Sequence, residues 1–404
     1  MSRAPVALYV HVPFCLSICP YCDFVVYAGR AARGPSNRID TFVDALVVEI
    51  GLRARPAAPL DSVYLGGGTP SLMSTAQAER ILSAIERGLG IAPDAEVTIE
   101  VNPGRDERGD LDGFRRVGVN RLSVGAQSFD GSELRRLGRR HSAADIAGTV
   151  AAARRAGIDN VSMDLLYDVP GQTTESWRRT LDATVALQPD HVSAYALALD
   201  DPQSEGLSGP TGDHLPARPG ARIWRRRARL EQDEDRAAEL YEIADDAFGL
   251  AGLDWYELSS WARPGRASRH NLGYWSGAAW EAVGPGAHAF DGMRTRRWNA
   301  ARLDTYLAAL LPTDGSAARL PPGGSEATVE RDATAEQAIL RLRTSAGLPA
   351  AALPEFGAAL AWASANGLTE PTDPGGIRLT RRGRLLSNEL FVRLLPDAPR
   401  DAAA

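Results

Sequence analysis

The sequence contains no lysine, so all 45 residues counted as lysine or arginine are arginines. This absence excludes enzymes that form a Schiff base on a lysine, enzymes that anchor pyridoxal phosphate on one, and Walker A nucleotide sites. Long hydrophobic runs are also missing, and no stretch approaches the roughly 18 apolar residues of a membrane span. The N-terminus lacks the apolar core of a signal peptide, so we expect a cytoplasmic protein.

Cysteine is scarce and confined to one short segment. The three cysteines are Cys15, Cys19 and Cys22. An odd number of clustered cysteines is a poor disulfide framework, and it favours a metal or redox site. The net charge of -6 and the pI of about 5.7 give no sign of a nucleic-acid partner.

The first half of the chain alternates between strand-like and helix-like patterns. Helical periodicity appears at Ile39–Leu52, Thr75–Gly88 and Ser142–Ala156. The β-rich runs that alternate with such segments are Ala7–Val12, Ser62–Leu65, Glu96–Val101, Arg121–Gly125, Val161–Leu166 and His191–Ala196. Alternating strands and helices predict an α/β fold with a parallel sheet. Six units suit an open, partial (β/α)6 TIM-like barrel, and a flat doubly wound sheet is the alternative. In barrels, functional residues lie at the carboxyl ends of the strands.

The second half predicts a linker and a small C-terminal module. We expect a solvated loop from Asp200 to Asp235 that includes the run Arg225–Arg227, then a helix to Leu250. Residues 1–310 form the predicted barrel domain with its extension, 311–328 a linker rich in Pro, Gly and Ser, and 329–404 the module. The module's predicted elements are the helices Thr334–Thr344, Ala358–Asn366 and Thr380–Leu395 and a strand-turn-strand before the last. This order resembles a winged helix, which we expect to pack on the barrel rather than to bind DNA.

The cysteines follow the first predicted strand with the spacing C-x3-C-x2-C. Three thiolates can bind three irons of a [4Fe-4S] cluster, but a fully ligated cluster needs a fourth cysteine, which this sequence lacks. One iron would therefore stay open or take a non-protein ligand. Zinc is a weaker alternative, because a structural zinc site needs four protein ligands.

This cysteine motif resembles that of the radical S-adenosylmethionine (SAM) superfamily, in which SAM chelates the open iron. The segment Tyr9-x-His11-x-Pro13-Phe14-Cys15 is similar to the oxygen-independent coproporphyrinogen III oxidase group. Similar motifs follow in order through Leu65–Ser71, Glu100–Pro103, Ser123–Phe129, Leu137–His141 and Asp164–Thr173. The resemblance implies that Tyr9 and Tyr21 flank the cluster. It implies a SAM site lined by Gly67, Gly68, Thr69, Glu100, Gln127, Arg139 and Asp164.

Three features separate this chain from the oxidases, and two of them, the residues after Cys22 and a later aromatic segment, resemble the HemW-type heme chaperone branch of the group. Asp23-Phe24 follows Cys22 where the oxidases carry a fourth cysteine, and only eight residues precede Tyr9. The segment from His270 to Trp275 spells H-N-x-x-Y-W, a signature of that branch. The resemblance implies heme binding by His270, Asn271, Tyr274 and Trp275. In it, His270 is the expected axial ligand and His288 a second candidate.

Three functions remain open from the sequence. The favoured one is a chaperone that binds a [4Fe-4S] cluster, SAM and heme and delivers heme to an acceptor hemoprotein, with membrane contact only through that acceptor. The main alternative is a coproporphyrinogen III oxidase of heme biosynthesis that cleaves SAM to a radical. A regulator that uses the cluster as a sensor is a third, and the acidic pI disfavours it.

Overall fold

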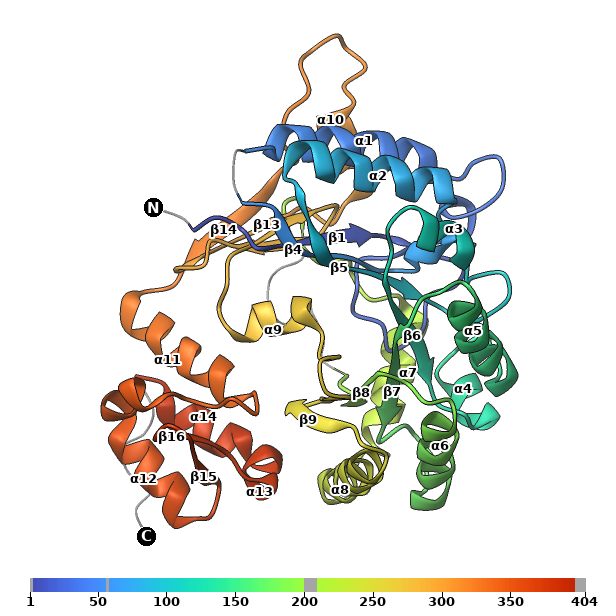
Figure 1. The fold of residues 1–404 in the computed structure, drawn as a ribbon. Coiled ribbons are helices and arrows are strands. Elements are labelled where there is room, and N and C mark those ends of the chain that lie inside the picture. The colour runs from blue at the N-terminus through green and yellow to red at the C-terminus, as the bar shows by residue number, and fades with distance from the viewer. Residues whose placement is uncertain (1–2, 56–57, 200–208, 397–404) are drawn as a thin grey trace.

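A computed structural model describes residues 3–55, 58–199 and 209–396. Its core is a curved sheet with six parallel strands joined by helices (Figure 1). These strands are β1 (Ala7–Val12), β4 (Leu60–Gly67), β5 (Ile91–Val101), β6 (Arg121–Gln127), β7 (Asn160–Tyr167) and β8 (His191–Ala196). They lie side by side in chain order, whereas a doubly wound sheet reverses its strand order. The predicted partial barrel is therefore confirmed.

Both edges of the parallel sheet are extended. At one edge β11 (Trp280–Val283) pairs in parallel with β1, and β12 (His288–Phe290), β13 (Thr295–Asn299) and β14 (Gly323–Ala327) follow in antiparallel pairs. At the other edge β10 (Ser260–Ala262) and β9 (Asp254–Glu257) add antiparallel strands to β8. These additions bring residues far along the chain beside the barrel's first strand.

Helices cover the outer face of the sheet (Figure 1). They are α1 (Ile39–Arg53), α2 (Thr75–Gly88), α3 (Leu111–Arg116), α4 (Gly131–Arg136), α5 (Ala143–Arg155), α6 (Thr174–Ala186), α8 (Glu234–Leu250) and α10 (Leu303–Leu310). Ser74 and Ser142 begin α2 and α5 with capping boxes, and Gly157 follows α5 with φ +77°. The side chains between helices and sheet form one apolar core. No helix among the described residues is both long and apolar enough to cross a membrane.

The C-terminal elements have a small core of their own. They are α11 (Glu330–Leu342), a 3-10 segment at Ala350–Phe356, α12 (Gly357–Ala365), the hairpin β15 (Thr369–Thr372) and β16 (Gly376–Leu379), α13 (Arg381–Leu385) and α14 (Ser387–Leu394). The hairpin precedes the last helices, as the winged-helix pattern predicts. Arg384 pairs with Asp245 of α8 at 2.7 Å, so the module contacts the barrel side of the molecule.

Three expectations need correction. Part of the predicted loop, 200–208, lies outside the described residues, but Pro219–Arg229 forms a helix, α7. Arg225 in α7 is buried, because it binds the cysteine loop, as described below. The last five residues before Thr328 form β14 rather than irregular linker, since they pair with β13. The predicted final helix breaks at Leu386, whose side chain is 40% exposed instead of sharing the buried face of Leu390 and Leu394.

Candidate functional site

The three cysteines lie on the loop that leaves β1. Cys15 ends a two-residue strand, β2 (Phe14–Cys15), and Cys22 closes a turn by donating its backbone N–H to the Cys19 carbonyl at 3.2 Å. Burial raises the pKa of the Cys15 thiol to about 11 and that of Cys22 to about 12. Thiolates at these positions therefore need a nearby positive charge, such as a bound metal centre.

Two side chains donate hydrogen bonds to the cysteine sulfurs. Thr69 Oγ1 donates to Cys15 Sγ at 3.3 Å, and Arg139 Nη1 donates to Cys19 Sγ at 3.7 Å. Asn102 connects the two, because its amide nitrogen donates to Thr69 Oγ1 and its oxygen accepts from Arg139. Hydrogen bonds to sulfur tune iron–sulfur clusters, so this surrounding fits a cluster better than it fits three inert thiols.

The sulfurs are not arranged around a single ion. Across the described ranges, no three His, Cys, Asp or Glu side chains are placed to hold one metal ion. A four-iron cluster holds its thiolates farther apart than one ion does, because each thiolate binds a different iron. The donor set of three sulfurs and the hydrogen bonds that they accept suit the cluster.

The carboxyl end of β4 brings backbone close to this loop. Gly67 has φ +111°, and a Cβ there would lie 2.5 Å from the His11 ring. A Cβ on Gly68 would lie 2.6 Å from the Phe14 carbonyl. Only glycine allows this approach. The Gly67 N–H donates to Glu100 Oε2 at 2.8 Å, which joins the ends of β4 and β5.

Glu100 is buried and its two oxygens have protein donors. Tyr64 Oη donates to Oε1 at 2.9 Å, and the Gly67 N–H donates to Oε2. Burial raises the pKa of this carboxyl to about 7. Each carboxylate oxygen has a second lone pair, so Glu100 can still accept a hydrogen bond from a diol.

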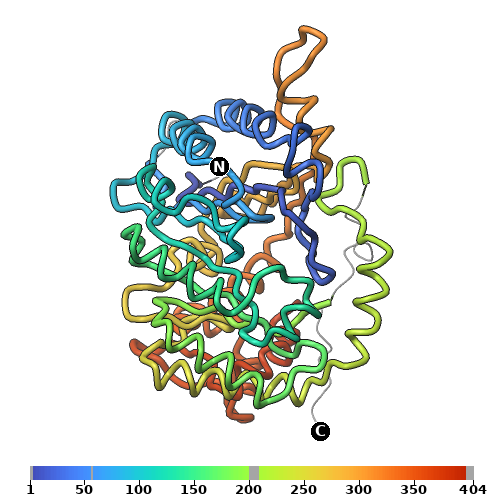
Figure 2. The backbone as a smooth tube through the Cα atoms, turned by 90° about the vertical axis from the view of Figure 1, so that its right-hand side faces the viewer, coloured from blue at the N-terminus to red at the C-terminus, as the bar shows by residue number. Residues whose placement is uncertain are grey.

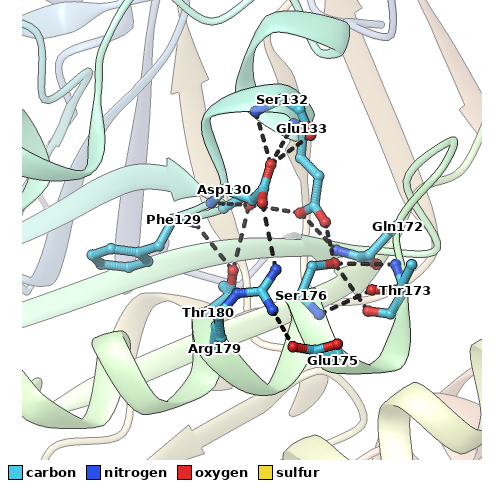
Figure 3. Close-up of polar contacts among 11 residues, drawn as sticks. Phe129, Asp130, Ser132, Glu133, Gln172, Thr173, Glu175, Ser176, Arg179 and Thr180 are labelled. Atoms are coloured by element: carbon cyan, nitrogen blue, oxygen red, sulfur yellow. Dashed lines mark hydrogen bonds and ion pairs between the residues drawn. The ribbon is translucent and has the colours of Figure 1, made fainter.

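The end of β6 is held in an uncommon backbone conformation. Gln127 has φ +64°, next to a register shift in the pairing with β7. Polar contacts fix the residues that follow, and those of Phe129 and Glu133 are drawn in Figure 3. Ser128 Oγ donates to the buried Glu133 at 2.6 Å, and the Phe129 N–H donates to Thr180 Oγ1 at 3.2 Å. Gln172 and Ser176 also donate to Glu133. This network explains how the strained turn at Gln127 persists.

The other residues predicted for the SAM site lie at neighbouring strand ends. Asp164 on β7 accepts from Ser123 Oγ at 2.9 Å, and burial raises its pKa. Arg139 donates to the Gly125 carbonyl at 2.8 Å. The predicted set therefore meets along one rim of the barrel, beside the cysteine loop. Tyr21 lies beside Cys19, Cys22 and Arg139, and its ring also packs among apolar residues that include Leu137 and Leu166.

A cavity of about 440 Å³ opens beside this rim. Its volume is within the usual range for small-molecule sites. Four parts of the chain line it. The segment just after the cysteines contributes Asp23, Phe24 and Val25, and the barrel strands contribute Tyr9, His11, Tyr64, Glu100 and Tyr195. The loop before α7 contributes Asp213 and His214, and the segment from α9 to β12 contributes His270, Asn271, Tyr274, Trp280 and His288. Glu100 and the H-N-x-x-Y-W segment therefore share one cavity.

The H-N-x-x-Y-W segment lies in α9 (Arg269–Trp275), and Glu96 of β5 binds the N-terminus of this helix. This buried carboxylate accepts from the backbone N–H groups of Arg269 and His270, each at 3.1 Å, and from Ser268 Oγ at 3.3 Å. Sequence analysis missed this role, because Glu96 and α9 lie more than 170 residues apart. A carboxylate at a helix N-terminus is favourable for its charge as well as its hydrogen bonds.

His270 does not present a free nitrogen to the cavity. Its Nδ1 is 2.9 Å from Ser62 Oγ and its Nε2 is 2.7 Å from Tyr274 Oη. The residue is 1% exposed, and burial lowers its pKa to about 3, so it is neutral. Axial ligation by His270 would require it to give up one of these bonds.

The aromatic residues of α9 face different ways. Tyr274 lines the cavity and packs edge-on against Trp280, with 4.6 Å between ring centroids. Trp275 does not line it, because its ring lies under the guanidinium of Arg343, 4.5 Å away, from the C-terminal module. Trp280 on β11 takes the place that the sequence assigned to Trp275.

Asp213 holds two cavity histidines at once. Its side chain is fully buried, and it pairs with His214 Nδ1 at 2.7 Å and with His288 Nε2. Burial alone would raise the pKa of Asp213, but the hydrogen bonds from the two histidines outweigh burial and lower it. Sequence analysis gave no role to Asp213 or His214, which come from a segment predicted as solvated loop.

Helix α7 lies on the outside of the molecule, along the side where the cysteine loop runs (Figure 2), and its Arg225 side chain binds that loop. Arg225 Nε donates to the Pro20 carbonyl at 3.0 Å, and Nη2 donates to the Cys22 carbonyl at 2.9 Å. The same guanidinium pairs with Asp23 at 2.5 Å. Asp23, which precedes the position where the oxidases carry a fourth cysteine, therefore has a structural partner about 200 residues away.

Comparison with known proteins places this architecture in a family. Residues 9–184 match the radical SAM superfamily. The chain is 38% identical over 400 residues to the heme chaperone HemW of Mycobacterium tuberculosis, covering 98% of this chain and 96% of that protein. The chain belongs to the HemW family.

Other HemW-family members and one solved structure agree with this assignment. The heme chaperone HemW of Bacillus subtilis is 31% identical, over 96% of this chain and 98% of that one. The coproporphyrinogen III oxidase HemN of Escherichia coli, a radical SAM enzyme, superposes with a TM-score of 0.74 at 24% identity, covering 98% of this chain and 91% of that one. At this identity the superposition shows the fold alone. The branch predicted from Asp23-Phe24 and the H-N-x-x-Y-W segment is confirmed.

Proposed function

We propose that this HemW-family chain is a heme chaperone, which binds heme in the cavity between the barrel rim and α9 and delivers it to an acceptor hemoprotein. The observation that carries the proposal is the cavity itself. It lies against the cysteine loop through Asp23 and Phe24, and flat aromatic side chains line it. Tyr274 and Trp280 offer apolar faces that suit a macrocycle. Heme is the cargo in this scheme.

In this proposal Cys15, Cys19 and Cys22 hold the [4Fe-4S] cluster, and SAM occupies the open iron. Gly67 and Gly68 leave room for SAM beside the cysteine loop, and Glu100 accepts from its ribose. The cluster and SAM would supply redox chemistry to the adjacent cavity. The residues Thr69 and Arg139 orient the sulfurs, while Gln127 and Asp164 complete the rim.

The test is a titration of ferric heme into anaerobically reconstituted protein, followed by mixing with apomyoglobin. We expect about one heme per chain, with a Soret band, and transfer of that heme to apomyoglobin. In parallel, the protein is incubated with coproporphyrinogen III, SAM and a reductant. Protoporphyrinogen IX formed without heme binding would contradict the proposal and favour the oxidase.

A matched pair of variants at exposed apolar residues tests whether heme binds in the cavity. Phe24 lines the cavity and is 63% exposed, whereas Leu250 is 91% exposed at the end of α8 and does not line it. Phe24→Ser should weaken heme binding about tenfold, because it removes apolar contact worth about 1–2 kcal/mol. Leu250→Ser removes an exposed apolar side chain elsewhere and should leave the affinity unchanged. Equal effects of the two variants would contradict this location.

A further inference from the structure

The histidines of this protein divide by how their ring nitrogens are used. The sequence contains six histidines, and the structure describes all of them. His11, His191 and His270 have partners on both nitrogens. His141 is buried outside the cavity wall and binds the Ala126 carbonyl through Nε2. None of these four offers an open nitrogen to the cavity.

The other two histidines are arranged differently. His214 and His288 both line the cavity, and each has one ring nitrogen on Asp213. Within the described part of the chain, the second nitrogen of each makes no hydrogen bond. Histidines that bind metals almost always place their other nitrogen on a carboxylate or carbonyl, which fixes the ring and raises its basicity. The pair around Asp213 has this arrangement already in place.

We propose that His288 is the axial ligand of the heme iron and that Asp213 orients its ring. This inference rests on the proposed heme cavity and names the residue that ligates the cargo there. His288 is the better placed of the two histidines, because its side chain is 42% exposed against 24% for His214. It lies on β12, which is paired with β13 and β11, whereas His214 lies on a loop.

Neighbouring groups hold the His288 ring in position. Trp298 stacks on it, with 6.0 Å between centroids and 26° between planes. Asp213 cannot turn away easily, because it is fully buried and His214 holds its other oxygen. A ligand on a strand, supported by a carboxylate and an aromatic ring, loses little freedom when the iron binds.

The experiment measures the Soret band and the affinity for ferric heme in the full, reconstituted chain. His288→Ala should shift the Soret band and weaken binding at least tenfold, because the iron loses its ligand. Free imidazole added to this variant should restore the band position by occupying the vacated space. Absorbance of the cluster and circular dichroism check that the variant folds.

Three further variants separate the roles. His214→Ala should weaken binding about threefold without moving the band, since it removes only a support of Asp213. Asp213→Asn should retain the ligand but raise the heme reduction potential, because a less basic imidazole stabilises ferric iron less. His270→Ala should leave the band position unchanged.

The outcomes distinguish this inference from the proposed function. Wild-type protein that binds no heme contradicts the chaperone proposal. Wild-type protein that binds heme, with an unchanged band in His288→Ala, overturns the assignment of His288 and leaves the chaperone proposal standing. A band that moves in His214→Ala or His270→Ala instead also overturns it.

Discussion

The cavity has two walls whose polar groups are satisfied in different ways. On the barrel wall, which the strand ends and α9 form together, Tyr64, Glu100 and His270 already have hydrogen-bond partners within the protein. In another part of the cavity lining, His214 and His288 share one carboxylate, and each keeps a nitrogen open. A wall whose groups bind each other gives shape and rigidity, whereas a wall with open donors and acceptors can bind a ligand.

The largest effect is expected where the cysteine loop is broken. Cys19→Ala removes one of only three thiolates, so the protein should lose its cluster completely. Heme binding should largely survive, because no cysteine lines the cavity as described. Iron and sulfide analysis and a heme titration measure the two properties separately.

Ser17→Ala, on the same loop, is the control and should keep a full cluster. A Cys19→Ala variant that retained about four irons per chain would contradict the cysteine assignment. Loss of heme binding together with the cluster would show that the cysteine loop and the heme cavity are not independent.

The next largest effect is expected on the barrel wall at Glu96. Glu96→Ala leaves the Arg269 and His270 N–H groups and Ser268 Oγ without their acceptor. Hydrogen bonds to a charged group are worth about 1.5–3 kcal/mol each. Three such bonds are lost, so we expect the free energy of unfolding to fall by at least about 4 kcal/mol, as measured by urea denaturation. Heme binding should also weaken, because α9 is released. Unchanged stability would show that Glu96 does not hold α9.

A smaller effect, dependent on pH, is expected at Glu100. Burial raises its pKa to about 7, so the carboxyl carries a charge only above that pH. SAM binding by wild-type protein should therefore strengthen as pH rises through about 7, and binding by Glu100→Gln should not. At pH 8 the variant should bind about tenfold more weakly, which corresponds to one charged hydrogen bond. Isothermal titration at several pH values measures this.

The raised pKa of Glu100 also predicts how the free energy of unfolding changes with pH. Its folded pKa of about 7 exceeds the ordinary value of 4.5, so the folded state holds the proton more tightly than the unfolded state. Its contribution to stability is full below about pH 4.5 and is lost as pH rises towards 7. The loss amounts to at most about 3 kcal/mol. Glu100→Gln should remove this part of the pH dependence, and identical profiles would contradict the raised pKa.

The smallest effect is expected at Asp94, which matches Glu96 in charge but not in burial. Its carboxylate is 85% exposed and pairs with Arg269 at 3.4 Å. Exposed ion pairs contribute little, so Asp94→Asn should change the free energy of unfolding by less than about 0.5 kcal/mol. A loss as large as that of Glu96→Ala would mean that charge near α9, rather than the buried hydrogen bonds, holds the helix.

The sequence predicted the barrel well because its signals are local. Alternating strands and helices marked all six parallel strands, and the periodic stretch Ser142–Ala156 marked α5 to within one residue at each end. The residues placed on the rim by resemblance do meet there. The pairing of His270 with Ser62 could not be predicted, since 208 residues separate them. Nor did the Arg225–Arg227 run reveal that Arg225 is buried against the cysteine loop.

The hydrogen bonds from Arg225 of α7 to the cysteine loop also determine when that loop can take its final form during synthesis. The Pro20 and Cys22 carbonyls receive their hydrogen bonds from Arg225, which lies 203 residues after Cys22. While the ribosome is still making the barrel, the loop that carries the third cysteine lacks this support. The cluster site is therefore completed only after more than half of the chain has emerged, so a nascent chain exposes its thiols before it can shelter a cluster.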